Sequence, residues 1–313
     1  TQFLRAFAMI LIINSHMVHY YPIPYMGTGG ALGNSLFFCL SAYGIYLSQK
    51  NNQKPFSVWF NGRISRIYPS MWIVLLFLKL PILLMLGQMN DEYVMTFIGN
   101  FFNPPHWFIR ALLVYYLLAF FLLADEQRTK LFSVFASLGV LYFVIYFTCI
   151  DLSKWTVEDS SFKLIHCFMI FLFGIYLASI NRSIVYTGIH NYFVLFFLIV
   201  VIYGHKFLMT KGLYAEFQFI QQAAMYPFVF YMLKISRSPF VLSVLIQSKI
   251  ISSSVNFIAN HSLELYIVQE TIYRPVLKLN FPFPLNAIIF IFLTCIFSAL
   301  VNKLASIIRA KIH

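Results

Sequence analysis

Long apolar runs separated by short polar connections dominate this chain. A helix that crosses a bilayer needs about 20 predominantly apolar residues. Ten runs approach that length, at residues 3–22, 32–48, 68–88, 107–124, 131–150, 162–180, 191–209, 217–235, 254–277 and 284–306. The connections, such as 49–65 and 124–130, are short and polar. The pattern predicts an all-α, polytopic membrane bundle of about ten transmembrane helices, with residues 1–313 forming a single domain.

Composition strengthens this prediction by what it excludes. Of the 313 residues, 60% are hydrophobic and only 10% are charged, against roughly 25% charged in ordinary soluble domains. Such a chain cannot cover a soluble surface, which excludes a cytosolic globular enzyme, a disordered chain and a nucleic-acid-binding module. The four cysteines, Cys39, Cys149, Cys167 and Cys295, lie in apolar stretches without C-x-x-C spacing. They are expected to be buried small side chains, with no metal site.

The net charge of +12 acquires a meaning once the basic residues are placed on the two sides of the membrane. With the N-terminus in the cytoplasm, thirteen basic residues fall inside and six outside. The inside set is Lys50, Lys54, Arg63, Arg66, Arg128, Lys130, Arg182, Lys234, Arg237, Lys249, Lys303, Arg309 and Lys311; the outside set is Lys154, Lys163, Lys206, Lys211, Arg274 and Lys278. The positive-inside rule therefore predicts that both termini are cytoplasmic, and most of the excess charge is a topology signal.

Two ionisable residues lie within the first apolar run. Arg5 and His16 are eleven residues apart, about three helical turns, so both face the same side with a rise of about 16 Å between them. Histidine titrates near neutrality and can accept a hydroxyl proton, whereas an arginine at the cytoplasmic mouth suits a phosphate or carboxylate. The alternative is that Arg5 extends to the membrane surface and His16 bonds a neighbouring helix.

A second basic feature precedes the third apolar run. Arg63 and Arg66 are three residues apart, so on a helical turn their guanidinium groups project to one side. Two such groups together suit a diphosphate. The same pair is equally typical of positive charge at the cytoplasmic start of a membrane helix.

Three motifs occur in order along the chain. They are Arg5 with His16, then Phe37, Phe38 and Ser41 in the second run, then Arg63 and Arg66 before a Tyr-Pro pair. Together they resemble the acyltransferase-3 family of integral membrane acyltransferases, and Trp107-Phe108 and the segment 262–269 look like two further family motifs. Ala42 replaces a usual glycine, and Gln269 stands where many members have histidine, so no role of that histidine can be transferred.

The resemblance implies an enzyme of the plasma (inner) membrane that moves an acyl group, most often acetyl, from cytoplasmic acetyl-CoA or another acyl-CoA. The acceptor would be a hydroxyl of a cell-surface or lipid-linked glycan. Arg5, Arg63 and Arg66 would hold the phosphates of the donor, with Ser41 beside them. His16 would act as general base, or would itself carry the acyl group. Acyl-CoA, the glycan and membrane lipids are the expected partners, without metal or nucleic acid.

Other polar residues are candidates for the acceptor side. Trp107 can stack on a sugar ring or anchor at the membrane surface. Arg110, one turn into the fourth run, is expected to face the bundle interior and to hold an acceptor phosphate or pair with Glu264 or Glu270. His19 can bind sugar or belong to an interfacial aromatic belt. Glu270 can alternatively pair with Arg274, four residues later.

Two other membrane functions compete with acyl transfer. A proton-coupled secondary transporter would also use buried His, Arg and Glu, without covalent chemistry. Such transporters often show paired, interrupted spans in two repeats, and no such pairing is visible. A glycan flippase or polymerase would be expected to have a long polar outer loop, which this sequence lacks.

Overall fold

The computed structural model describes residues 1–87, 91–123, 128–151 and 161–312, whose regular elements are helices joined by loops, without a strand. The first half of the chain forms α1 (Gln2–His16), α2 (Gly30–Asn51), α3 (Phe56–Val74), α4 (Leu80–Met85), α5 (Asp91–Gly99), α6 (Trp107–Leu123) and α7 (Arg128–Cys149). The second half forms α8 (Lys163–Ser179), α9 (His190–Thr210), α10 (Phe219–Ile235), α11 (Pro239–Gln247), α12 (Lys249–Asn260), α13 (Ser262–Leu277) and α14 (Leu285–Ile312). A π-helical segment, Leu75–Lys79, joins α3 to α4, and short 3-10 turns lie at Pro24–Met26, Asn181–Ser183 and Ala215–Phe217.

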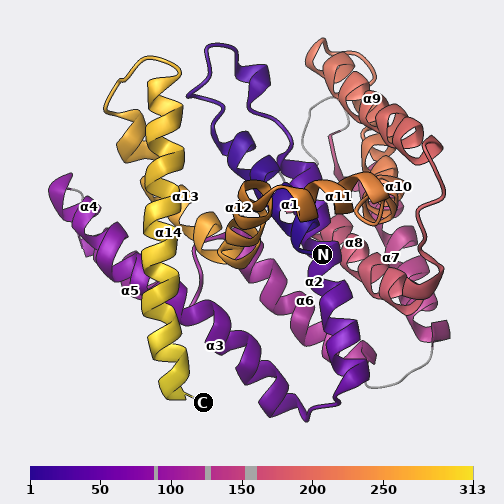
Figure 1. The fold of residues 1–313 in the computed structure, drawn as a ribbon, viewed down its shortest axis with the longest axis horizontal. Coiled ribbons are helices and arrows are strands. Elements are labelled where there is room, and N and C mark those ends of the chain that lie inside the picture. Colours follow the sequence, from indigo (N-terminus) through magenta and orange to yellow (C-terminus); the bar gives the residue numbers. More distant parts are fainter. Residues whose placement is uncertain (88–90, 124–127, 152–160, 313) are drawn as a thin grey trace.

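Helices α1 and α2 lie at the centre of the bundle (Figure 1). α2 packs against α1 and α8, while α1 also contacts α12 and α13. Small residues permit the closest of these contacts: a Cβ at Gly174 of α8 would come within 2.3 Å of the Cys39 carbonyl oxygen on α2. Close backbone approach of this kind is how helices pack in membranes, where there is no water to drive them together. The central position of α1 places its polar residues among several helices.

The number of transmembrane helices differs from the prediction. Within the described residues, five helices are long and apolar enough to span a membrane, or six if α10 and α11, bent by 55°, form one broken span. Helices α6 and α8 are apolar but have 17 residues each. The count of about ten is not confirmed, because several apolar runs in the sequence are divided or shortened in the structure.

The first predicted span, 3–22, is one of the shortened runs. α1 ends at His16, and the Asn14 side chain donates hydrogen bonds to the carbonyl oxygens of Met26 and Thr28, each at 2.8 Å. The Tyr21 hydroxyl donates to Asn14 Oδ1 at 2.6 Å. An asparagine side chain that bonds loop backbone competes with helix continuation. The loop after α1 therefore folds back, and His16 sits at a helix end.

The third and ninth predicted spans were also placed incorrectly. Helix begins at Phe56 and continues through the π segment to Met85, so Arg63 and Arg66 lie inside α3 and do not precede it. Because residues 56–67 include charged side chains, they did not form an apolar run in the sequence. They belong to an amphipathic helix whose buried face includes Trp59 and Ile67. The predicted span 254–277 is divided at His261 into α12 and α13.

The two ends of the bundle carry different connections. The α2–α3 connection and the C-terminus lie at one end, whereas the loop after α1 and the α13–α14 connection lie at the opposite end (Figure 1). The positive-inside pattern predicts the same grouping. Which end faces the cytoplasm stays a prediction.

Candidate active site

His16, at the C-terminal end of α1, faces a carboxylate from the far end of the chain. Its Nδ1 atom is 3.9 Å from Oε1 of Glu270 on α13. The side chains are 31% and 37% exposed, so this pair borders open space while lying within the bundle. A carboxylate beside one imidazole nitrogen orients the ring and stabilises its protonated form. The other nitrogen can then exchange a proton with a hydroxyl.

A second histidine completes this centre. His106, just before α6, has its Nδ1 atom 3.7 Å from Oε2 of Glu270, and its side chain is only 10% exposed. Glu270 thus lies between two imidazole rings, one on each carboxylate oxygen. The Tyr266 ring, one turn earlier on α13, lies 6.3 Å from the His16 ring and 5.7 Å from the His106 ring. The charge of Lys79 also acts on Glu270.

Sequence reasoning missed this grouping. It did not connect His106 with Glu270, and it offered Arg274 as a partner for Glu270. Among the described residues, no ion pair joins Glu270 to Arg274; the carboxylate turns to the histidines. The one available signal was the spacing of Tyr266 and Glu270, four residues apart and therefore on one face of α13.

Three predicted acceptor residues lie elsewhere. Arg110 is exposed on α6, so the expectation that it faces the interior is wrong; its neighbours Phe108, Ile109 and Ala111 form the buried face. Glu264 is 2% exposed and accepts a hydrogen bond from Ser70 Oγ at 2.7 Å, which links α13 to α3. His19 is exposed in the loop after α1, with its ring 6.4 Å from that of Tyr273.

The three arginines of the predicted donor site do come together. Arg63 and Arg66 on α3 lie close enough to Arg5 on α1 for their positive charges to interact with it electrostatically. The Arg63 guanidinium carbon lies 5.4 Å from the centre of the Trp59 ring and 5.7 Å from that of Tyr116. These stacking contacts hold the guanidinium plane in place. We call Arg5, Arg63 and Arg66 the arginine cluster.

Ser41 belongs to the same region. Its side chain is hydrogen-bonded to the Tyr116 hydroxyl, and Tyr116 lies under Arg63. One turn along α2, a Cβ at Gly44 would meet Arg5 Nη2 at 3.8 Å. Ser41 therefore lies near the arginine cluster and about three turns of α1 away from His16.

In the part of the chain that the structure describes, the arginine cluster is not paired with an acidic side chain. Among the described residues, no carboxylate lies within 4 Å of any of its three guanidinium groups. By contrast, Arg237 lies in a nest of acceptors that includes the Asn181 carbonyl oxygen, 3.0 Å from its Nη1 atom. Like charges held together without a counter-ion are costly, and an anionic ligand would relieve that cost. The cluster has the chemistry of a phosphate or diphosphate site.

Trp107 follows His106 in the sequence and begins α6. Lys163 Nζ stands 4.4 Å from the centre of the Trp107 ring, and Phe38 contacts that ring at 6.3 Å. The residue also lines a cavity of about 330 Å³ that includes Ser15 and Asn34. Trp107 is therefore beside a polar cavity, as a sugar-stacking residue requires, while Lys163 covers part of its ring.

Comparison with known proteins identifies the family. A model of the acyltransferase domain of the acyltransferase 3 family matches residues 2–303. The chain belongs to the acyltransferase 3 family. Neither a curated protein nor a solved structure shows significant similarity to it. The family supplies the reaction class, acyl transfer by a membrane protein, and leaves the roles of individual residues to be argued from their geometry.

Gln269, the departure from the family's late motif, occupies a buried position. It is 0% exposed, and neither polar atom of its side-chain amide has a hydrogen-bond partner. It lies next to Glu270 in sequence, but consecutive helical residues point about 100° apart. The carboxylate that meets His16 is therefore Glu270, and Gln269 is directed into the packed interior.

Proposed function

We propose that this membrane acyltransferase moves an acyl group, acetyl in the first instance, from cytoplasmic acyl-CoA to a hydroxyl of a cell-surface or lipid-linked glycan. The observation that carries the proposal is the arrangement along α1. Arg5 begins the helix within the arginine cluster, and His16 ends it against Glu270. The rise between them is about 16 Å. A phosphate site and a base site joined by one helix suit a long donor with phosphates at one end and a thioester at the other.

The arginine cluster would bind the donor phosphates through charge-assisted hydrogen bonds. Arg63 is stacked on two aromatic rings and is therefore already oriented. Ser41 would act through Tyr116 by holding the ring on which Arg63 rests. The donor supplies the acyl group as a thioester, and this chain's residues supply position and proton transfer.

His16 would take the proton from the acceptor hydroxyl as that oxygen attacks the thioester carbonyl. The hydroxyl oxygen forms the new ester bond, the carbon–sulfur bond breaks, and the thiolate of CoA leaves and is then protonated. Glu270 would hold the His16 ring and stabilise the positive charge that the ring acquires. Transfer through an acyl group on His16 is the alternative route. The enzyme would lie in the plasma membrane with both termini in the cytoplasm.

The transporter alternative receives no support. The family match is to an acyltransferase domain. Arg5 of α1 belongs to the arginine cluster, and His16 of α1 belongs to the histidine–carboxylate centre. Together these two groups suit a reaction with two substrates. A carrier would not need three guanidinium groups that pair with no described carboxylate at a fixed distance from a base.

The deciding experiment incubates purified protein with acetyl-CoA labelled on the acetyl group and measures label transferred and CoA released. His16→Ala should lower the rate by about 10²–10⁴, the range that general base catalysis contributes. His190→Ala is the matched control, because His190 is an exposed residue at the start of α9 bonded to Thr187. Equal rates in His16→Ala and the native chain would refute the role of His16.

A further inference from the structure

A large aromatic cavity lies apart from the site described above. Its volume is about 1010 Å³, and residues of α2, α6, α7, α8 and α10 line it. Phe132, Phe135 and Phe173 line its middle, together with Met169 and Leu172. We call it the aromatic cavity. Its walls come mostly from side chains that offer no hydrogen bonds, so its interior suits hydrocarbon.

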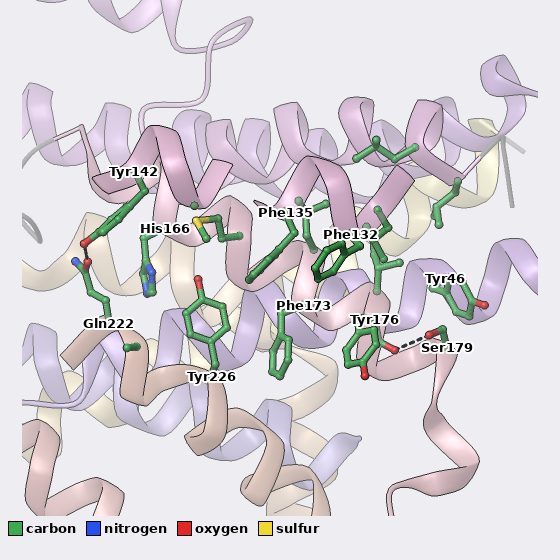
Figure 2. A pocket seen from close by; sticks show the side chains of 18 of the residues that line it. Tyr46, Phe132, Phe135, Tyr142, His166, Phe173, Tyr176, Ser179, Gln222 and Tyr226 are labelled. Atoms are coloured by element: carbon green, nitrogen blue, oxygen red, sulfur yellow. Dashed lines mark hydrogen bonds between the residues drawn. The ribbon is translucent and has the colours of Figure 1, made fainter. Parts of the chain in front are cut away.

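Polar side chains lie at both ends of the aromatic cavity: Tyr46, Tyr176 and Ser179 lie at one end, and a second polar group lies at the other (Figure 2). Figure 2 shows His166, Tyr142, Gln222 and Tyr226 gathered there. The Tyr142 hydroxyl donates to Gln222 Oε1, and the Tyr226 ring meets the His166 ring edge-on at 5.6 Å. His166 is 7% exposed, and its buried Nε2 atom has no hydrogen-bond partner among the described residues. A buried polar atom left without a partner is costly, so a ligand that bonds it would be favoured.

A smaller cavity adjoins the end at His166. It has a volume of about 330 Å³, and His166 and Gln222 line both cavities. The rest of its wall carries hydroxyl and amide groups, including those of Ser15, Thr28 and Asn34. We call it the polar cavity. The aromatic cavity and the polar cavity share two lining residues, so together they suit an amphiphile, which has a hydrocarbon chain and a polar head group.

The length of the aromatic cavity fits a lipid chain. It follows α8 from His166 to Ser179, thirteen residues and therefore about 20 Å of helix. One leaflet of the bilayer interior is about 15 Å deep. A hydrocarbon chain as long as one leaflet is deep would thus lie along α8 with its polar end at His166.

We propose that the two cavities bind one long-chain amphiphile, with its hydrocarbon chain in the aromatic cavity and an oxygen-rich head group in the polar cavity, where His166 Nε2 bonds a head-group oxygen. A phosphate and a sugar both carry such oxygens. Of the residues discussed for acyl transfer, Trp107 lines the polar cavity, whereas the arginine cluster, His16 and Glu270 line neither cavity.

The test measures binding of radiolabelled hexadecyl phosphate and hexadecyl glucoside to the full chain in nanodiscs. Gly139→Leu should fill the aromatic cavity, because Gly139 lines it and a Cβ there meets only Met169 Cε, at 3.7 Å. We expect binding to weaken about tenfold, or ~1.4 kcal/mol. Gly204→Leu is the matched control: Gly204 is an exposed helical glycine on α9 with nothing within 4 Å of an added Cβ.

A second variant tests the end at His166. His166→Phe keeps a flat ring and removes the unpartnered nitrogen, so it should weaken both amphiphiles and leave binding of hexadecane unchanged. If hexadecyl phosphate binds more tightly than hexadecyl glucoside, the head group is a phosphate; if the glucoside binds more tightly, it is a sugar. Either result supports the proposal. Equal affinity in Gly139→Leu and Gly204→Leu, or unchanged amphiphile binding in His166→Phe, would overturn it. His16→Ala should bind both amphiphiles normally, which separates this proposal from the proposed reaction.

Discussion

The two charged regions at the ends of α1 are built in opposite ways. The arginine cluster collects three positive charges from α1 and α3 without a carboxylate within 4 Å among the described residues. The centre at His16 collects groups of both signs, with Glu270 between two imidazoles. In the proposed function an anion from outside the protein completes the first arrangement, whereas the second contains groups of both signs. The comparison indicates that one end is arranged for binding and the other for moving a proton.

The largest effect is expected from removing the negative charge at the His16 centre. Glu270→Gln keeps the shape of the side chain but cannot stabilise a protonated imidazole, so kcat for acetyl transfer should fall about 10²–10³-fold, with little change in KM for the donor. Steady-state kinetics with acetyl-CoA checks this prediction. Glu264→Gln is the control on the same helix, since an amide oxygen can still accept the hydrogen bond from Ser70. A normal kcat in Glu270→Gln would mean that the carboxylate only shapes the helix packing.

An intermediate effect is expected at the arginine cluster. Arg66→Ala removes one charged donor, and hydrogen bonds to charged groups contribute about 1.5–3 kcal/mol. KM for acyl-CoA should therefore rise about ten- to a hundredfold while kcat changes little, and the salt dependence of KM should become weaker. Arg182→Ala, an exposed arginine in the turn after α8, provides the control. If kcat falls and KM for acyl-CoA does not rise, then the two ends of α1 do not separate donor binding from proton transfer as we propose.

The smallest effect concerns stability beside the His16 centre. Gln269 is buried with both polar side-chain atoms unpartnered, and each such atom costs about 1–3 kcal/mol. Gln269→Met fills a similar volume without them and should raise the thermal unfolding midpoint in detergent. Gln222→Met should lower it, because it deprives the Tyr142 hydroxyl of its acceptor. A lower midpoint for Gln269→Met would show that the amide has a partner in the membrane-embedded protein.

The helical class followed from the sequence, but the limits of its spans did not. An apolar run indicates that a segment is buried. It does not show whether the segment is buried in lipid or in protein, because both environments favour the same residue types. Such runs also cannot show that Asn14 bonds the backbone of its own loop and ends α1, or that the charged stretch before Tyr68 is helical. The break at His261 between α12 and α13 was likewise hidden inside one continuous apolar run.

Within the candidate site, the sequence alone determined the relations that lie along one helix. The periodicity of α1 places Arg5 and His16 on one face, and the spacing of Arg63 and Arg66 turns them to one side of α3. Only the tertiary structure decided which residues meet across helices. His106 and Glu270 come from distant parts of the chain. The packing of α13 against α1 brings Glu270 to His16, and His106, just before α6, meets the same carboxylate. Local geometry is encoded residue by residue, whereas contacts between helices depend on how the whole bundle packs.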